Sequence, residues 1–271
     1  MITSKNLFIN REISWLEFNE RVLEEADDPT VPLIERIRFL GIFSNNLDEF
    51  YRVRYATVKR IAVSTNSGKK LFKGRTAQEL LNDITLKATD LQQKSFLTLN
   101  NIIKLLEKDK IYFIDESKIK FNHRQFINNY FFEIISPAIE VIILNKNKKF
   151  PKFKENLSFL LIRIVLEDDE IQNAIIRLPR NLDRFVILPS DSIEQNIIMI
   201  DDIIRFHLKD IFKIFNPKSI EANMVKASRD AELDFDDDIS KSYLDKIAQS
   251  VKERSSADPV RFVYDLSLIH I

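Results

Sequence analysis

The stretch FLGIFSNNLDEFYRVR, residues 39–54, combines aromatic, arginine and carboxamide side chains at high density. Ser44, Asn45 and Asn46 are of the residue types that cap helix N-termini, and Glu49 follows Asn46 by three positions. The pattern predicts that one amphipathic helix ends at this step and that a second begins there. Asn46 is the expected N-cap, with Ser44 and Asn45 as competing candidates.

Capping boxes mark two further helices, one on each side of this stretch. Glu17 follows Ser14, and Glu79 follows Thr76, at the spacing that lets a side chain and a backbone amide bond reciprocally. The second box opens an apolar pattern of helical period that continues to about Lys108. Residues 1–110 are therefore predicted to form an all-helical domain of four helices.

Beyond Lys110 the pattern changes to short apolar runs separated by turn residues. The acidic turn between residues 166 and 172 is typical of a hairpin. We expect strands at 111–114, 157–166, 172–178, 184–188, 196–200, 220–228 and 260–264, and helices at 122–136, 201–215 and 238–254. The predicted fold class is α+β: an all-helical N-terminal domain, then an α+β head domain, residues 111–265, with a mainly antiparallel sheet.

Composition excludes several classes of function. The chain has 271 residues with 41 basic and 41 acidic side chains, so no global field favours nucleic acid as a partner. It has no cysteine, and its three glycines form neither a GxGxxG turn nor a Walker loop. No apolar run is long enough for a membrane-spanning segment, and we interpret the protein as cytoplasmic.

The three histidines predict no metal site. His123 and His207 have no second histidine or cysteine at ligand spacing, so we expect surface or packing roles for them. The third, His270, lies in the tail LSLIHI, residues 266–271. This tail is the translation of CTG TCT CTT ATA CAC ATC, which matches the end of a common sequencing transposon. We expect residues 266–271 to be adaptor-derived and the gene to be truncated there.

Five strings of this sequence together resemble the bacterial polyphosphate kinases of the long, histidine-phosphorylated type. They are REISWLEFNERVLEEA, PLIERIRFLGIFSNNLDEFYRVR, FVILP, SRDAELDF and DPVRFVY, and they occur in the family's order between residues 11 and 264. The resemblance implies an N-terminal helical domain and a dimerising head domain, hence a homo-oligomer. It also implies reversible transfer of the ATP γ-phosphate to inorganic polyphosphate, with Mg²⁺ and through a phosphohistidine that lies beyond this chain. The chain alone is then expected to be inactive.

The family's ATP contact in the N-terminal domain is the second asparagine of the SNNLDEF string, which is Asn46 here. A carboxamide suits an adenine edge because it offers a donor and an acceptor side by side. The residues alone favour the cap at Asn46, whereas the resemblance favours the ATP contact. No catalytic residue carries over to this chain.

Arginines lie in pairs on both sides of the SNN step: Arg36 with Arg38, and Arg52 with Arg54. Guanidinium groups suit phosphate recognition. We hypothesise that Arg38 and Arg54 lean toward the nucleotide or polyphosphate. A non-catalytic nucleotide-binding and dimerisation module is the alternative function.

Overall fold

The structure is a computed structural model that describes residues 10–64, 75–145, 151, 158–230 and 259–264. These residues divide into two compact units. The first is built from those within Met1–Leu105 and Ser228–Arg261, and the second from those within Leu106–Ala227 and Phe262–Ile271. The expected domain limits, residues 110 and 265, stay a prediction. The helix expected at 238–254 and the tail 266–271 lie outside the described residues.

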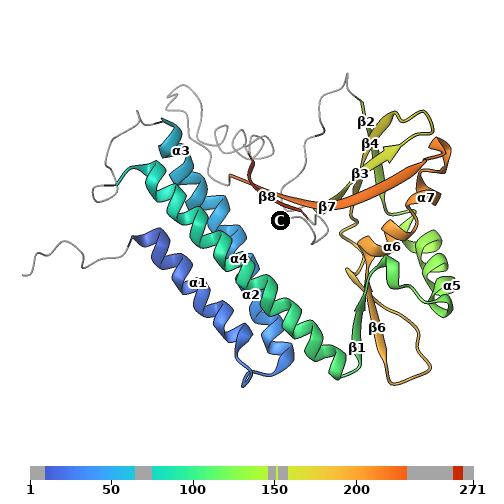
Figure 1. Ribbon diagram of the computed structural model, residues 1–271, viewed down its shortest axis with the longest axis horizontal. Coiled ribbons are helices and arrows are strands. Elements are labelled where there is room, and N and C mark those ends of the chain that lie inside the picture. The colour runs from blue at the N-terminus through green and yellow to red at the C-terminus, as the bar shows by residue number, and fades with distance from the viewer. Residues whose placement is uncertain (1–9, 65–74, 146–150, 152–157, 231–258, 265–271) are drawn as a thin grey trace, which may run out of the picture. The chain divides into compact units, whose positions relative to one another are not determined.

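Helices dominate the described residues of the first unit (Figure 1). They are α1 (Arg11–Asp27), α2 (Leu33–Phe50), α3 (Ala56–Ser64) and α4 (Ala77–Lys108), and a π-helical turn, Tyr51–Tyr55, joins α2 to α3. The predicted capping box opens α4: the Thr76 Oγ1 accepts from the Glu79 amide at 3.1 Å, and Glu79 accepts from the Thr76 amide at 2.8 Å. The end predicted at Lys108 is confirmed.

Two predicted helix starts are wrong. The chain does not break at Ser44–Asn46, because the apolar face of α2 (Leu40, Phe43, Leu47 and Phe50) continues through this step at helical spacing, and all four side chains are buried. Asn46 is therefore not an N-cap. The α1 helix begins before Ser14, because the Asn10 Oδ1 accepts from the backbone amides of Glu12 and Ile13.

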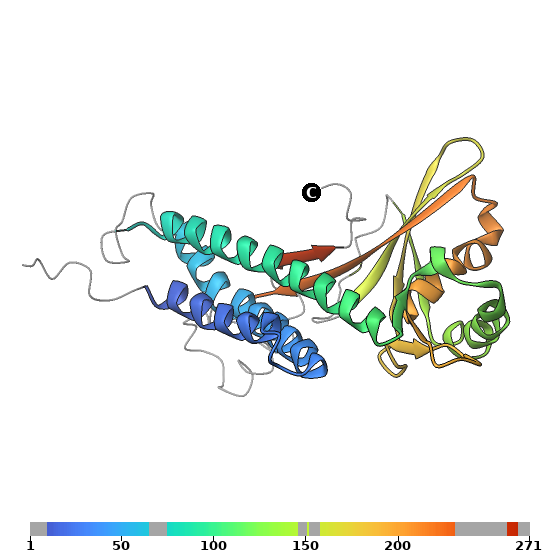
Figure 2. The ribbon, with the colours of Figure 1, turned by 60° about the horizontal axis from the view of Figure 1, so that its bottom comes forward.

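The second unit is α+β with a mainly antiparallel sheet, as predicted (Figure 2). One sheet has the order β1-β6-β5, with a parallel β1–β6 pair, and the other has the order β2-β4-β3-β7-β8. The strands are β1 (Ile111–Ile114), β2 (Glu140–Leu144), β3 (Ser158–Val165), β4 (Ile171–Arg177), β5 (Phe185–Ile187), β6 (Gln195–Met199), β7 (Ser219–Arg229) and β8 (Pro259–Tyr264). The strand β2 was not predicted, although its run Val141–Leu144 is apolar and rich in β-branched residues.

The helices of the second unit confirm one expected helix and divide the other. They are α5 (Phe121–Tyr130), α6 (Ile200–Phe206) and α7 (Leu208–Ile211), with a π-helical turn, Phe131–Ile135, and 3₁₀ turns at Glu116–Lys118 and Lys213–Phe215. The single helix expected at 201–215 is thus divided at His207, whose φ and ψ are −98° and 12°. The α5 helix begins at Phe121, and with the π-helical turn that follows it covers residues 121–135, close to the expected 122–136.

One apolar core joins α5 and α6 to both sheets. Ile127 and Phe131 pack in the same cluster as Ile162, Ile198 and Ile203. His207 lies at the edge of this core, with its ring stacked on Phe131 at 4.0 Å between centroids. Both His123 and His207 are buried, in agreement with packing roles.

A buried ionic cluster lies at the start of α6. Asp201 is fully buried and Asp202 nearly so. The Arg205 guanidinium contacts Asp202 at 2.7 Å and Asp201 at 3.4 Å, and Arg184 contacts Asp201 at 3.1 Å. Burial, followed by the neighbouring charge of Asp201, raises the pKa of Asp202 to about 7, and Arg205 opposes this rise.

This raised pKa predicts a pH-dependent stability. The folded state holds a proton on Asp202 that the unfolded chain, with a carboxyl pKa of about 3.9, releases. The contribution of Asp202 to the free energy of unfolding is therefore full below pH ~4 and is lost as the pH rises to about 7. Urea unfolding from pH 4 to 8 should show that Asp202→Asn, which stays neutral, gains stability relative to the parent as the pH rises.

The control for this prediction is Ile203→Val on the same helix. Its cost of about 1 kcal/mol arises from lost packing and should not change with pH. A difference between Asp202→Asn and the parent that stays constant from pH 4 to 8 would contradict the prediction.

Candidate functional site

The candidate site lies where α1 and α2 pack in antiparallel directions. Their contacts form a series along the two helices. Glu12 contacts Arg54, Trp15 stacks on Phe50, Asn19 bonds to Asn46, and the Ala26 carbonyl accepts from Arg36. Residue numbers rise along α1 while those of their partners on α2 and its π-helical extension fall, as expected for an antiparallel helix pair.

Asn46 faces α1 from within α2. Its Nδ2 donates to the Asn19 Oδ1 at 3.1 Å, and the Asn19 Nδ2 donates to the backbone carbonyl of Phe43 at 3.2 Å. Asn19 is fully buried, whereas Asn46 is half-buried. The Asn46 side chain is therefore accessible and held by a neighbour, and it is not consumed by a helix cap.

An aromatic and cationic group continues the site one turn further along. Trp15 stacks on Phe50 with 5.0 Å between ring centroids and 25° between planes. The Arg54 guanidinium lies 5.9 Å from the Trp15 ring and 3.0 Å from the buried carboxylate of Glu12. This arrangement places a partly exposed cation beside an aromatic surface.

The four arginines that flank the SNN step have different roles in the structure. Arg36 is buried and donates to the backbone carbonyls of Ala26 and Asp27, so it satisfies the end of α1. Arg52 lies 3.5 Å from Glu49. Arg38 is exposed and contacts Glu35 at 2.5 Å. Arg38 and Arg54 are each eight residues from Asn46, or about 12 Å along a helix axis, in opposite directions, so the structure does not bring the two together.

Two ion pairs add C-terminal segments to the helical unit. Arg261 contacts Asp48 at 2.5 Å and lies 4.8 Å from the centre of the Tyr51 ring. Arg60 contacts Asp230 at 3.0 Å. These contacts link α2, its π-helical extension and α3 to Asp230 and Arg261, a link that helical periodicity could not have predicted.

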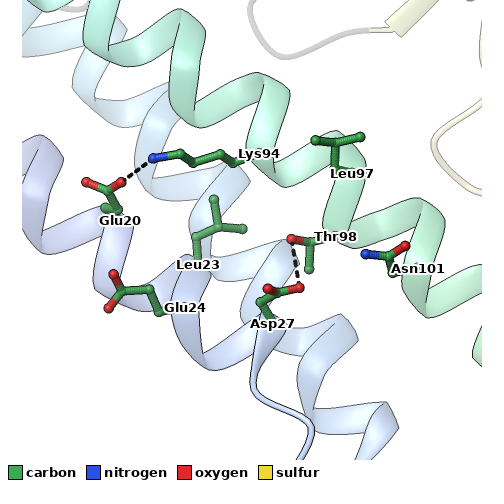
Figure 3. Close-up of a pocket in the computed structure, with 8 residues that line it drawn as sticks. All are labelled: Glu20, Leu23, Glu24, Asp27, Lys94, Leu97, Thr98 and Asn101. Atoms are coloured by element: carbon green, nitrogen blue, oxygen red, sulfur yellow. Dashed lines mark hydrogen bonds and ion pairs between the residues drawn. The ribbon is translucent and has the colours of Figure 1, made fainter.

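A groove lies between α1 and α4 (Figure 3), and none of the predicted site residues lines it. Its volume is about 440 Å³, and its lining residues are Glu20, Leu23, Glu24, Asp27, Lys94, Leu97, Thr98 and Asn101. Glu20 pairs with Lys94 at 2.7 Å and with Lys87, and these bonds lower the pKa of Glu20. The Thr98 hydroxyl donates to Asp27. The polar groups of the groove thus largely bond to one another and join α1 to α4.

No metal centre is apparent in the part of the chain that the structure describes. Within those residues, no three histidine, cysteine, aspartate or glutamate side chains are grouped to hold an ion. The described helices also include none that is long and apolar enough to cross a membrane.

Along the chain, a helical unit is followed by an α+β unit with a mainly antiparallel sheet. Comparison with known families gives a specific assignment. Residues 8–114 match the polyphosphate kinase N-terminal domain, and residues 122–269 match the polyphosphate kinase middle domain. The chain belongs to the polyphosphate kinase family.

Curated relatives agree with this assignment. Polyphosphate kinase of Escherichia coli strain K12 is 36% identical over 266 residues, which are 96% of this chain and 38% of that protein. The enzyme of Vibrio parahaemolyticus is 37% identical over 270 residues. A crystal structure of polyphosphate kinase from Porphyromonas gingivalis superposes with a TM-score of 0.72 at 27% identity, covering 93% of this chain and 38% of that one. The chain therefore spans about two fifths of the length of these relatives.

Proposed function

We propose that this chain supplies the N-terminal and middle domains of an enzyme that reversibly transfers the ATP γ-phosphate to inorganic polyphosphate. The observation that carries the proposal is the match of both domains, in order, over nearly the whole chain. In the proposed reaction a histidine attacks the γ-phosphorus of ATP, ADP leaves, and the phosphoryl group then passes to the terminal oxygen of polyphosphate. We assign that histidine to the part of the enzyme beyond this chain.

The histidines described here support this assignment, since both are in packed positions. His123 is 3% exposed and His207 is 2% exposed. Neither side chain is accessible for in-line attack on a nucleotide. Mg²⁺ would accompany ATP and be held outside this chain.

We further propose that the role of this chain is to bind the nucleotide through the half-buried amide of Asn46. Because the α2 helix runs through Asn46 without a break, the capping role that would compete with base recognition is absent. Among the described residues, the Asn46 amide bonds to Asn19, which leaves its carbonyl oxygen and one N–H for a ligand. The middle domain would contribute a homo-oligomer contact, as the resemblance implies.

The first test has two parts: the reading frame after Tyr264, and the turnover of ATP with polyphosphate by residues 1–265. A frame that continues into histidine- and arginine-containing domains supports the enzyme, whereas a native stop codon supports the non-catalytic binding and dimerisation module. Residues 1–265 purified alone should show no turnover of ATP with polyphosphate. Measurable turnover by that fragment would contradict the placement of the nucleophile beyond it.

The second test compares two neighbouring asparagines in the full-length enzyme. Asn46→Ala should raise the KM for ATP about tenfold, because one hydrogen bond to the base is worth about 1.4 kcal/mol. Asn45→Ala on the exposed side of the same helical turn is the matched control and should leave this KM within twofold. Equal KM values for ATP in all three proteins would rule out Asn46 as the contact.

The third test concerns the arginines. Arg38 and Arg54 are proposed phosphate contacts, supported by the exposed guanidinium of the first and by the position of the second beside Trp15. Arg38→Gln and Arg54→Gln should each raise the KM for ATP or for polyphosphate about ten- to hundredfold, since a charge-assisted bond contributes about 1.5–3 kcal/mol.

The control is Arg21→Gln, an exposed arginine on α1 whose guanidinium lies over Phe18. It should leave both Michaelis constants and chain elongation unchanged. If Arg38→Gln and Arg54→Gln behave as this control does, neither arginine contacts phosphate.

A further inference from the structure

Asn19 is a buried polar side chain on the apolar face of α1. Leu16 and Leu23, on the same face, are also buried, and Asn19 lies between them at 0% exposure. A buried amide without partners costs free energy, so both ends of the Asn19 side chain must be bonded. The Asn19 Nδ2 donates to the Phe43 carbonyl, and its Oδ1 accepts from the Asn46 Nδ2.

These two bonds determine which way both amides face. A backbone carbonyl can only accept, so the Asn19 group that meets the Phe43 oxygen must be Nδ2. The Asn19 Oδ1 then faces Asn46, and an oxygen can be met there only by the Asn46 Nδ2. A flip of either amide by 180° would bring two acceptors together inside the helix pair.

The bond to Phe43 is not needed to satisfy that carbonyl. Phe43 lies inside α2, where each carbonyl accepts from the amide four residues further on. The bond from Asn19 is an additional one, and its consequence is to fix the orientation of Asn19. Asn46 is in turn held with Nδ2 bonded to α1, and its carbonyl oxygen takes no part in that bond.

We propose that Asn19 is a positioning residue that holds the Asn46 carbonyl oxygen toward the nucleotide base and so selects adenine over guanine. The inference rests on the proposed contact between Asn46 and ATP. Adenine has an amino donor at C6, which a fixed carbonyl oxygen accepts, whereas guanine has a carbonyl acceptor at C6, which that oxygen repels. An Asn46 amide free to flip could present its N–H to guanine instead.

The experiment measures kcat and KM for ATP and for GTP as phosphoryl donors in the full-length enzyme. Asn19→Ala removes the fixed acceptor, so Asn46 can rotate. We expect kcat with ATP to stay within about twofold and the ratio of kcat/KM for ATP to that for GTP to fall about tenfold. Asn19→Ser keeps one hydroxyl of undefined direction, so the ATP-to-GTP ratio should fall less. It replaces Asn19→Ala if Asn19→Ala does not fold.

Leu23→Val is the matched control for lost stability. It removes buried volume from the same face of α1, one turn from Asn19, without touching Asn46. Thermal unfolding should show lower midpoints for both Leu23→Val and Asn19→Ala, but only the Asn19 variants should change the ATP-to-GTP ratio. A purely structural role for Asn19 would leave that ratio unchanged in every variant.

The outcomes separate this inference from the proposed function. If Asn46→Ala raises the KM for ATP but the Asn19 variants keep the parental ATP-to-GTP ratio, the positioning role is overturned and the ATP contact stands. If Asn46→Ala leaves the KM for ATP unchanged, the contact itself is absent and the positioning role falls with it.

Discussion

The polar contacts between α1 and α2 are the constraint on which the helical unit depends. Apolar contacts such as Trp15 on Phe50 supply attraction but little direction, because a helix pair can slip by one turn and still bury apolar surface. Asn19 and Arg36 do not permit such a slip. Each is buried with its bonds made across the pair, and displacement would leave an amide or a guanidinium without a partner. The register of α1 on α2, and hence the surface around Asn46, is fixed by these groups.

In the α+β unit, the buried ionic cluster likewise fixes the position of one element on another. Arg205 bridges Asp201 and Asp202 and also donates to the Ala222 carbonyl on β7, so α6 is tied to the sheet by a cation that cannot lose its charge. The same burial that makes this link specific is responsible for the raised pKa of Asp202. The burial of these charges thus both fixes the position of α6 on the sheet and makes ionisation of Asp202 costly, as expected for charges removed from water.

Sequence patterns predicted those features that are set by local chemistry. The Thr76–Glu79 box forms because both partners lie within one helical turn. The strands β3 and β4 were predicted from the acidic turn between apolar runs, and the structure has them paired from Phe159–Arg177 to Val165–Ile171. The Ser44–Asn46 step was misread because Ser and Asn are compatible with a cap or with a helix interior. Asn46 has a tertiary partner, Asn19, 27 positions earlier, which no local rule can find.

At the candidate site, too, local chemistry could be predicted from the sequence and tertiary contacts could not. Asn46 was identified through a family resemblance, but its surroundings were not, and Asn19 was missed. A signal was present: Asn19 interrupts an otherwise apolar stripe between Leu16 and Leu23, and a polar residue in such a position requires a buried partner. A helix cap and a contact with ATP would compete for the same Asn46 side chain. The continuous α2 helix removes that competition, because a carboxamide that caps nothing and is bonded at one end has its other end available to a ligand.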